Sequence, residues 1–145
     1  MLVLMASCFN QGDCVVNSTN QVKILLLKKL DGTPKQTVFL TIKSIHATDT
    51  LLLFSQDAAN PTPITALSLP LNPNYDSTTF LLERSDEKSF GLTLGYSTYT
   101  KLISTDCGAF LYYKNLKVKQ TDFDSTRVVN SQLLVNVSKN LQIYM

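Results

Sequence analysis

The sequence predicts an all-β protein, an antiparallel β-sandwich of the Greek-key or jelly-roll type, on three observations. Short runs of Leu, Val and Ile recur at intervals of roughly ten to fifteen residues from Val22 to the end of the chain, each of strand length. Gly, Pro, Asn and Asp separate these runs and favour turns. No stretch has the spacing of apolar residues that an amphipathic helix needs. A β-trefoil or a β-barrel would fit the same pattern, so both stay as alternatives.

The clearest periodicity lies at Leu116-Lys117-Val118-Lys119, where alternation places both lysines on one face of a half-buried strand. The other expected strands share β-branched, aromatic or leucine-rich composition and are bounded by turn residues. Together the expected strands cover residues 22–27, 38–42, 51–54, 66–69, 79–82, 91–94, 109–113, 116–119, 133–137 and 141–144.

Turn residues predict how some of these strands connect. Asp31-Gly32 favours a tight hairpin that joins the strand at Val22 to the strand at Val38, because Gly tolerates positive φ. Prolines flank the run at 66–69, which predicts a short strand or an edge strand, since proline cannot donate to a ladder. Residues 84–89 are mixed in charge and predict a solvated hairpin loop.

Length and composition indicate one domain, residues 1–145, with no membrane span. The hydrophobic residues make up 44% and the charged residues 17%, and the net charge is only +2. Such a small charge disfavours nucleic acid and anionic membranes as partners. Polar but uncharged strand faces are typical of proteins that pack against copies of themselves or against another protein surface.

The segment Met1–Cys8 resembles the end of a bacterial lipoprotein signal, in which an apolar run and two small residues precede the lipid-bearing cysteine. The apolar run is short, and no basic segment precedes it. A first β-strand is therefore the favoured interpretation.

Cysteine spacing predicts a small loop disulfide. Cys8 and Cys14 flank the turn-like residues 10–13, so they would pair in an oxidising compartment and leave Cys107 free. In a reducing compartment all three would stay thiols. No Cys-x-x-Cys pair exists and His46 is the only histidine, so neither a metal nor another cofactor is expected.

The sequence also predicts that the protein is not an enzyme. His46 ends an expected strand, and neither a G-x-S-x-G elbow nor a glycine-rich phosphate loop is present. Residues 122–126 match the D-x-D-x-T pattern of haloacid-dehalogenase-like phosphotransferases. However, an amphipathic strand precedes them and few residues follow, so Asp122 and Asp124 are expected in a turn.

A region rich in Tyr and Lys is the candidate binding surface, because such residues stack on ligand rings while gripping anionic groups. Its candidate residues are Tyr96, Tyr99, Tyr112, Tyr113, Lys114, Lys117 and Lys119, with Lys101 nearby. The alternative is that half of the tyrosines belong to the core and that the lysines protect a strand edge.

These features favour a non-enzymatic assembly module with protein partners, such as a subunit of a viral capsid, cement or spike structure. The second hypothesis is a secreted or surface-displayed domain that binds a glycan or a protein receptor through the Tyr and Lys region. The expected location is therefore a virion, the cell surface or the extracellular space.

Overall fold

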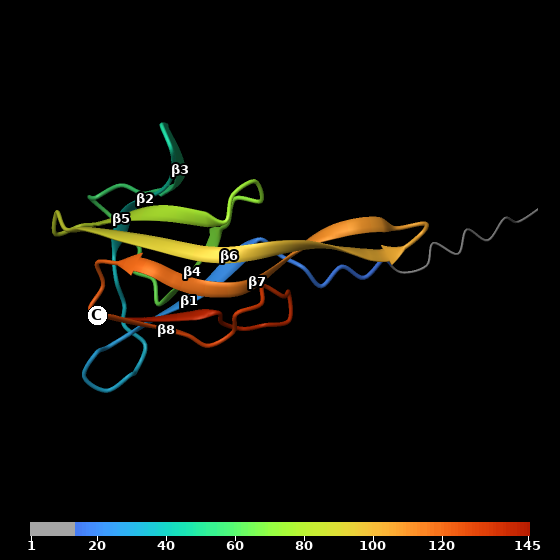
Figure 1. Cartoon of the computed structure of the whole chain (residues 1–145). Coiled ribbons are helices and arrows are strands. Elements are labelled where there is room, and N and C mark those ends of the chain that lie inside the picture. Colours follow the sequence, from blue (N-terminus) through green and yellow to red (C-terminus); the bar gives the residue numbers. More distant parts are fainter. Residues whose placement is uncertain (1–13) are drawn as a thin grey trace, which may run out of the picture.

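The computed structural model describes residues 14–145 and forms two β-sheets that pack face to face (Figure 1). The predicted β-sandwich is thus confirmed, and neither sheet closes into a barrel. The strands are β1 (Gln21–Leu27), β2 (Phe39–His46), β3 (Asp49–Ser55), β4 (Ala66–Pro70), β5 (Ser77–Arg84), β6 (Ser89–Ser104), β7 (Gly108–Thr121), β8 (Ser125–Val128) and β9 (Leu141–Tyr144).

One sheet has the strand order β4-β1-β9-β8 and the other has the order β3-β2-β5-β6-β7. Neighbouring strands are antiparallel except for β1 and β9, which pair in parallel. Alternate residues of both sheets point into the space between them, as the period of two requires. The largest fully buried side chains include Ile24, Leu26, Phe39, Phe80, Leu82, Leu92, Leu94, Leu133, Leu141 and Ile143. Each contributes roughly 1.5–3 kcal/mol through burial.

The two sides of the sandwich differ. On the side of β7 and β8, the connection that follows β8 closes the gap between the sheets. The backbone N–H of Leu116 donates to the carbonyl of Ser131 (3.0 Å), and the N–H of Leu133 donates to the carbonyl of Tyr113 (3.1 Å). On the other side, β3 and β4 are both edge strands, and an apolar groove of about 450 Å³ lies between them. The short edge strand predicted at residues 66–69 is thus confirmed as β4.

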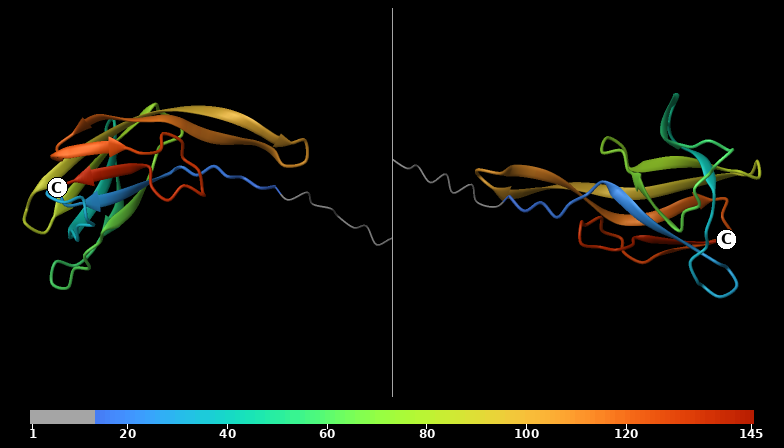
Figure 2. Two further views of the ribbon diagram at one scale, coloured as in Figure 1. Left: turned by 90° about the horizontal axis from the view of Figure 1, so that it is seen from below. Right: turned by 180° about the vertical axis from the view of Figure 1, so that it is seen from behind.

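Strands β6 and β7 are much longer than the sequence predicts. Their far ends extend beyond the sandwich as a two-stranded hairpin, seen in yellow and orange in Figures 1 and 2. This hairpin, residues 97–114, is called the arm below. The expected separate strands at 109–113 and 116–119 are one strand, because a bulge at Asn115 continues the ladder instead of ending it.

The prediction that a hairpin at Asp31-Gly32 pairs the strand at Val22 with the strand at Val38 is wrong. The turn itself forms: Gly32 has a φ of 70°, and its N–H donates to the carbonyl of Lys28. The chain then returns only as far as a bridge between Leu27 and Pro34 before it crosses to the other sheet. Strands β1 and β2 therefore lie in different sheets. The turn residues explain why the chain reverses at Gly32. The packing of the two sheets explains why the following strand, β2, joins the other sheet.

The expected strand at 133–137 is also wrong. Leu133 is fully buried, but the segment forms only an isolated bridge between Leu134 and Ser18. Its backbone carbonyls are satisfied elsewhere, since the ammonium of Lys23 donates to the carbonyls of Val135 (2.8 Å) and Val137 (2.6 Å). The first strand expected within residues 1–8, and the lipoprotein-like pattern there, lie outside the described residues.

Candidate functional site

The structure divides the four predicted tyrosines between the two faces of the larger sheet. Tyr96 and Tyr113 point into the core, 4% and 5% exposed, with ring centroids 5.9 Å apart. The hydroxyl of Tyr96 donates to the carbonyl of Asn72 (2.6 Å) and pairs with the hydroxyl of Thr78 (2.8 Å). Burial raises the pKa of Tyr96, against the opposing effect of these hydrogen bonds. These two tyrosines are structural, as the alternative interpretation predicts for half of the set.

Tyr99 and Tyr112 lie instead on the face that turns away from the smaller sheet, here called the outer face. They are directly paired across β6 and β7, and their ring centroids are 5.4 Å apart. The ammonium of Lys101 lies 5.6 Å from the ring centroid of Tyr112, and that of Lys114 lies 5.1 Å from the centroid of Tyr99. The two cation–π contacts cross each other and hold both lysines over the rings.

The bulge at Asn115 decides which lysines share this face. In a regular strand Lys114 and Lys117 would point to opposite faces, because their separation is odd. Asn115 has a φ of 57° and is the extra residue of a β-bulge. Because of this extra residue, Tyr113 and Leu116 both point inward, and Lys114 and Lys117 both point outward. Asparagine tolerates the left-handed region, and this was the available sequence signal for the bulge.

Gly95 provides the space that the remaining lysines occupy. A Cβ atom at Gly95 would lie 2.7 Å from Cε of Lys119 and 3.1 Å from Cε of Lys117. Both aliphatic chains therefore lie across this glycine on the outer face. The predicted sharing of a face by Lys117 and Lys119 is confirmed. We call Lys101, Lys114, Lys117 and Lys119 the lysine row.

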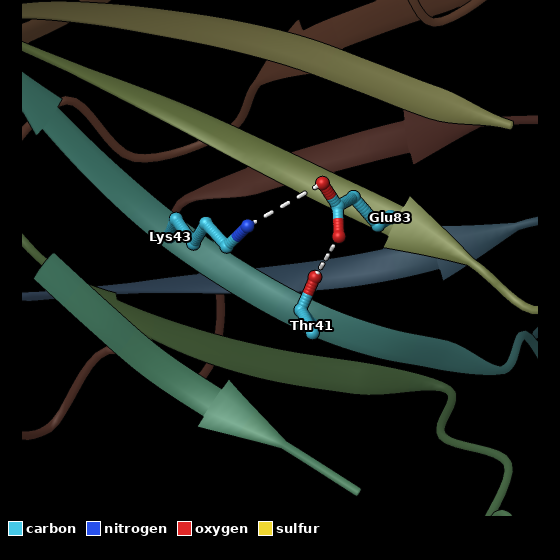
Figure 3. Close-up of polar contacts among 3 residues, drawn as sticks. All are labelled: Thr41, Lys43 and Glu83. Carbon is cyan, nitrogen blue, oxygen red and sulfur yellow. Dashed lines mark hydrogen bonds and ion pairs between the residues drawn. The ribbon is translucent and has the colours of Figure 1, made fainter. Parts of the chain in front are cut away.

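Charge pairing distinguishes the lysine row from the rest of the outer face. Near β2 and β5, Lys43 forms an ion pair with Glu83 (Nζ to Oε1, 3.5 Å), and the same carboxylate accepts a hydrogen bond from the hydroxyl of Thr41 (Figure 3). The ion pairs within residues 14–145 join Lys29 to Asp124, Lys43 to Glu83 and Arg84 to Asp86. None of them involves the lysine row, which is therefore a line of uncompensated positive charge.

The second candidate surface is the open edge at β3. Leu51 and Phe54 pair with Ser44 and Ile42 of β2, whose side chains are buried, so both point toward the smaller sheet. That sheet ends at β4, and Leu51 is consequently 62% exposed. Leu52, on the opposite face, is 55% exposed. The groove beside them is lined by Ile42, Leu53, Phe54, Ile64, Leu67 and Leu69.

The predicted disulfide between Cys8 and Cys14 is wrong, because Cys14 is bonded to Cys107. Cys107 lies in the turn at the tip of the arm, and Cys14 lies in the segment that precedes β1. No sequence pattern places these two residues together, because their contact depends on the length of β6 and β7. Cys8 lies outside the described residues.

The residues considered for catalysis are dispersed. His46 ends β2, as expected, and its ring stacks on Tyr75 at 5.1 Å. Asp122 and Asp124 lie in the bend between β7 and β8, which confirms the predicted turn. Asp122 accepts a hydrogen bond from the N–H of Gly91 (2.8 Å). Across residues 14–145, no group of three or more His, Cys, Asp and Glu side chains is placed to hold a metal ion.

Fold and surfaces together define a β-sandwich domain with an open apolar edge and a basic arm. The chain belongs to DUF6452, a family of unknown function whose pattern matches residues 39–145. No curated protein and no solved structure matches the chain. Residues 14–145 contain no helix that is long and apolar enough to cross a membrane.

Proposed function

We propose that this protein is a non-enzymatic assembly module, which associates through the free edge of β3. The observation that carries the proposal is the row of exposed apolar side chains on that edge, Leu51, Leu52 and Phe54. Their exposure in an isolated chain is unfavourable, and an added strand would cover them while pairing with the free backbone groups of β3.

The other edge strands are protected in ways that β3 is not. Strand β4 ends in Pro70, β7 carries Lys117 and Lys119, and β8 carries an exposed Arg127. Charged side chains and proline block the pairing of an edge with another strand. From Thr50 to Ser55, β3 contains neither, and its one irregularity is a bulge at Leu53. This contrast supports a β3 edge that is covered in the working assembly.

A second copy of this chain is the partner that fits the edge best. Two β3 strands related by a two-fold axis pair antiparallel, so the leucines of one copy meet the leucines of the other and the larger sheets join into one. Centred on Leu52, this arrangement places Asp49 of one copy opposite Ser55 of the other. The two Asp49 carboxylates then lie at opposite ends of the interface and do not repel each other.

The test compares solution mass for the parent chain and two variants, using light scattering across a range of concentrations. Leu51→Lys places a charge on the β3 edge. Leu102→Lys is the matched control, because Leu102 lies on the arm at 64% exposure, close to the 62% of Leu51. We expect the parent and Leu102→Lys to form dimers or larger assemblies and Leu51→Lys to be monomeric.

A monomeric parent chain at every concentration would overturn the proposal and favour the receptor-binding or glycan-binding hypothesis. Equal association by Leu51→Lys and the parent would overturn the role of β3. The assignment to a capsid, cement or spike structure stays a prediction from the sequence. The disulfide between Cys14 and Cys107 supports maturation in an oxidising compartment, since such bonds are rare in the cytosol.

A further inference from the structure

We infer that the outer face of the arm and of the adjoining part of β7 is a binding site for a linear acidic polysaccharide. The residues that carry this inference are the four members of the lysine row, Lys101, Lys114, Lys117 and Lys119. The site lies on strands β6 and β7, whereas the assembly edge proposed above is β3. The two proposals therefore stand on separate observations.

Geometry makes the lysine row linear. Lys114, Lys117 and Lys119 follow one strand, and Lys101 lies on the neighbouring strand beyond the Tyr99 and Tyr112 pair. Residues 112 to 120 lie opposite residues 99 to 93 of β6, so at about 3.3 Å per residue this stretch spans roughly 20 Å. A narrow line of positive charge of this length matches a chain molecule with repeated negative groups better than it matches a single small anion.

The lysine row is also preorganised. Contacts with Tyr99 and Tyr112 hold the ammonium groups of Lys101 and Lys114, and Gly95 gives Lys117 and Lys119 a surface to lie across. Holding the side chains in place before binding lowers the entropy that an anionic ligand must overcome. Because these lysines have no carboxylate partners within residues 14–145, no internal ion pair has to break when a ligand binds.

The same contacts disfavour other polyanions. Binding of single-stranded nucleic acid relies on free aromatic faces for base stacking. Here Tyr112 is only 5% exposed, and lysine ammoniums lie over both rings. A lipid surface would favour apolar side chains next to the charges. Leu102, at 64% exposure, belongs to the opposite face of the arm, since it is one residue from Lys101, and Tyr99, at 37% exposure, has the ammonium of Lys114 next to its ring.

The binding test uses sulfated heparin oligosaccharides and carboxylated polygalacturonate oligosaccharides, with neutral dextran as the ligand control. Lys117→Glu/Lys119→Glu reverses two charges of the lysine row. The matched control is Lys28→Glu/Lys88→Glu, which changes the net charge equally in two exposed loops. We expect the first variant to weaken binding about tenfold or more and the control to change it by less than about twofold, with affinity falling as salt rises.

Several outcomes would overturn the inference. Absence of binding to both acidic oligosaccharides would do so, as would equal weakening by the two double variants, which would indicate an effect of net charge alone. Tighter binding of single-stranded DNA or of phosphatidylglycerol vesicles would assign the lysine row to another ligand class. If the melting temperature of the glutamate variant falls by more than about 2 °C, the binding test is repeated with Lys117→Gln/Lys119→Gln, which removes the charges without reversing them.

Discussion

Cys14 and Cys107 are joined by a disulfide although 93 residues separate them in the sequence. The bond links the segment before β1 to the tip of the arm. The hydroxyl of Ser18 supports the same contact by donating to the carbonyl of Leu111 (2.6 Å). A two-stranded hairpin that projects from a sandwich has few contacts of its own, so this bond limits the freedom of the arm relative to the rest of the fold.

Loss of this disulfide should lower stability and loosen the arm. Replacing Cys107 with Ser should reduce the free energy of unfolding by about 2–4 kcal/mol, since a long closed loop constrains the unfolded chain strongly. Chemical denaturation measures this loss. Peptide mapping without reduction should recover Cys14 and Cys107 in one linked fragment, and a fragment linking Cys8 to Cys14 would contradict the structure.

The hydroxyl of Tyr96 should contribute to stability through its buried hydrogen bonds. Tyr96→Phe leaves the carbonyl of Asn72 and the hydroxyl of Thr78 without this partner, and should cost about 1–2 kcal/mol. Tyr113→Phe is the matched control, because its ring is equally buried against Tyr96. A larger loss in Tyr113→Phe would contradict this assignment.

Tyr96 should also make the fold sensitive to alkali. Burial raises the pKa of Tyr96 above its ordinary value of 10.0, so the neutral phenol is favoured in the folded protein. The resulting stability is fully present below pH 10.0 and is lost as the pH rises through the folded pKa. Unfolding followed at increasing pH should therefore show a steeper loss for the parent than for Tyr96→Phe.

Asn140 should be the most costly polar side chain to replace. It is 1% exposed, and its side-chain oxygen accepts from the N–H of Lys23 (3.0 Å). Its amide donates to the carbonyls of Asn130 (3.2 Å) and Gln132 (2.9 Å). Asn140→Leu removes all three bonds and should cost about 2–4 kcal/mol, measured by denaturant unfolding. Asn130→Ala, in an exposed position, should cost far less, and similar losses for both would refute the role of Asn140.

Thr41 should control the acidity of Glu83. The hydrogen bond from the Thr41 hydroxyl lowers the pKa of Glu83, partial desolvation opposes this, and the charge of Lys43 adds to the lowering. The associated stability is present above the ordinary pKa and is lost as the pH falls through the folded value. In an NMR titration, Thr41→Val should raise the pKa of Glu83. Thr93→Val, which removes a hydroxyl bonded to Thr79 instead, should leave that pKa unchanged.

Local features of this protein can be predicted from its sequence. The strands at Val22 and Phe80 follow from short apolar runs between turn residues, the strand at Leu141 follows from alternation, and the reversal at Gly32 follows from its tolerance of positive φ. The shared face of Lys117 and Lys119 follows from the same period of two. These features depend on residues within a few positions of each other, so local rules suffice to predict them.

Which distant elements contact each other depends on how the two sheets pack. The placement of β2 opposite β1, the bond from Cys14 to Cys107 and the burial of Tyr96 depend on contacts between residues far apart in the chain. Leu51 and Leu82 belong to similar leucine runs, yet one is exposed at an open edge and the other is fully buried. The difference arises because the smaller sheet covers β5 but ends at β4 and leaves β3 uncovered. The residues near Leu51 in the sequence do not indicate where the opposing sheet ends.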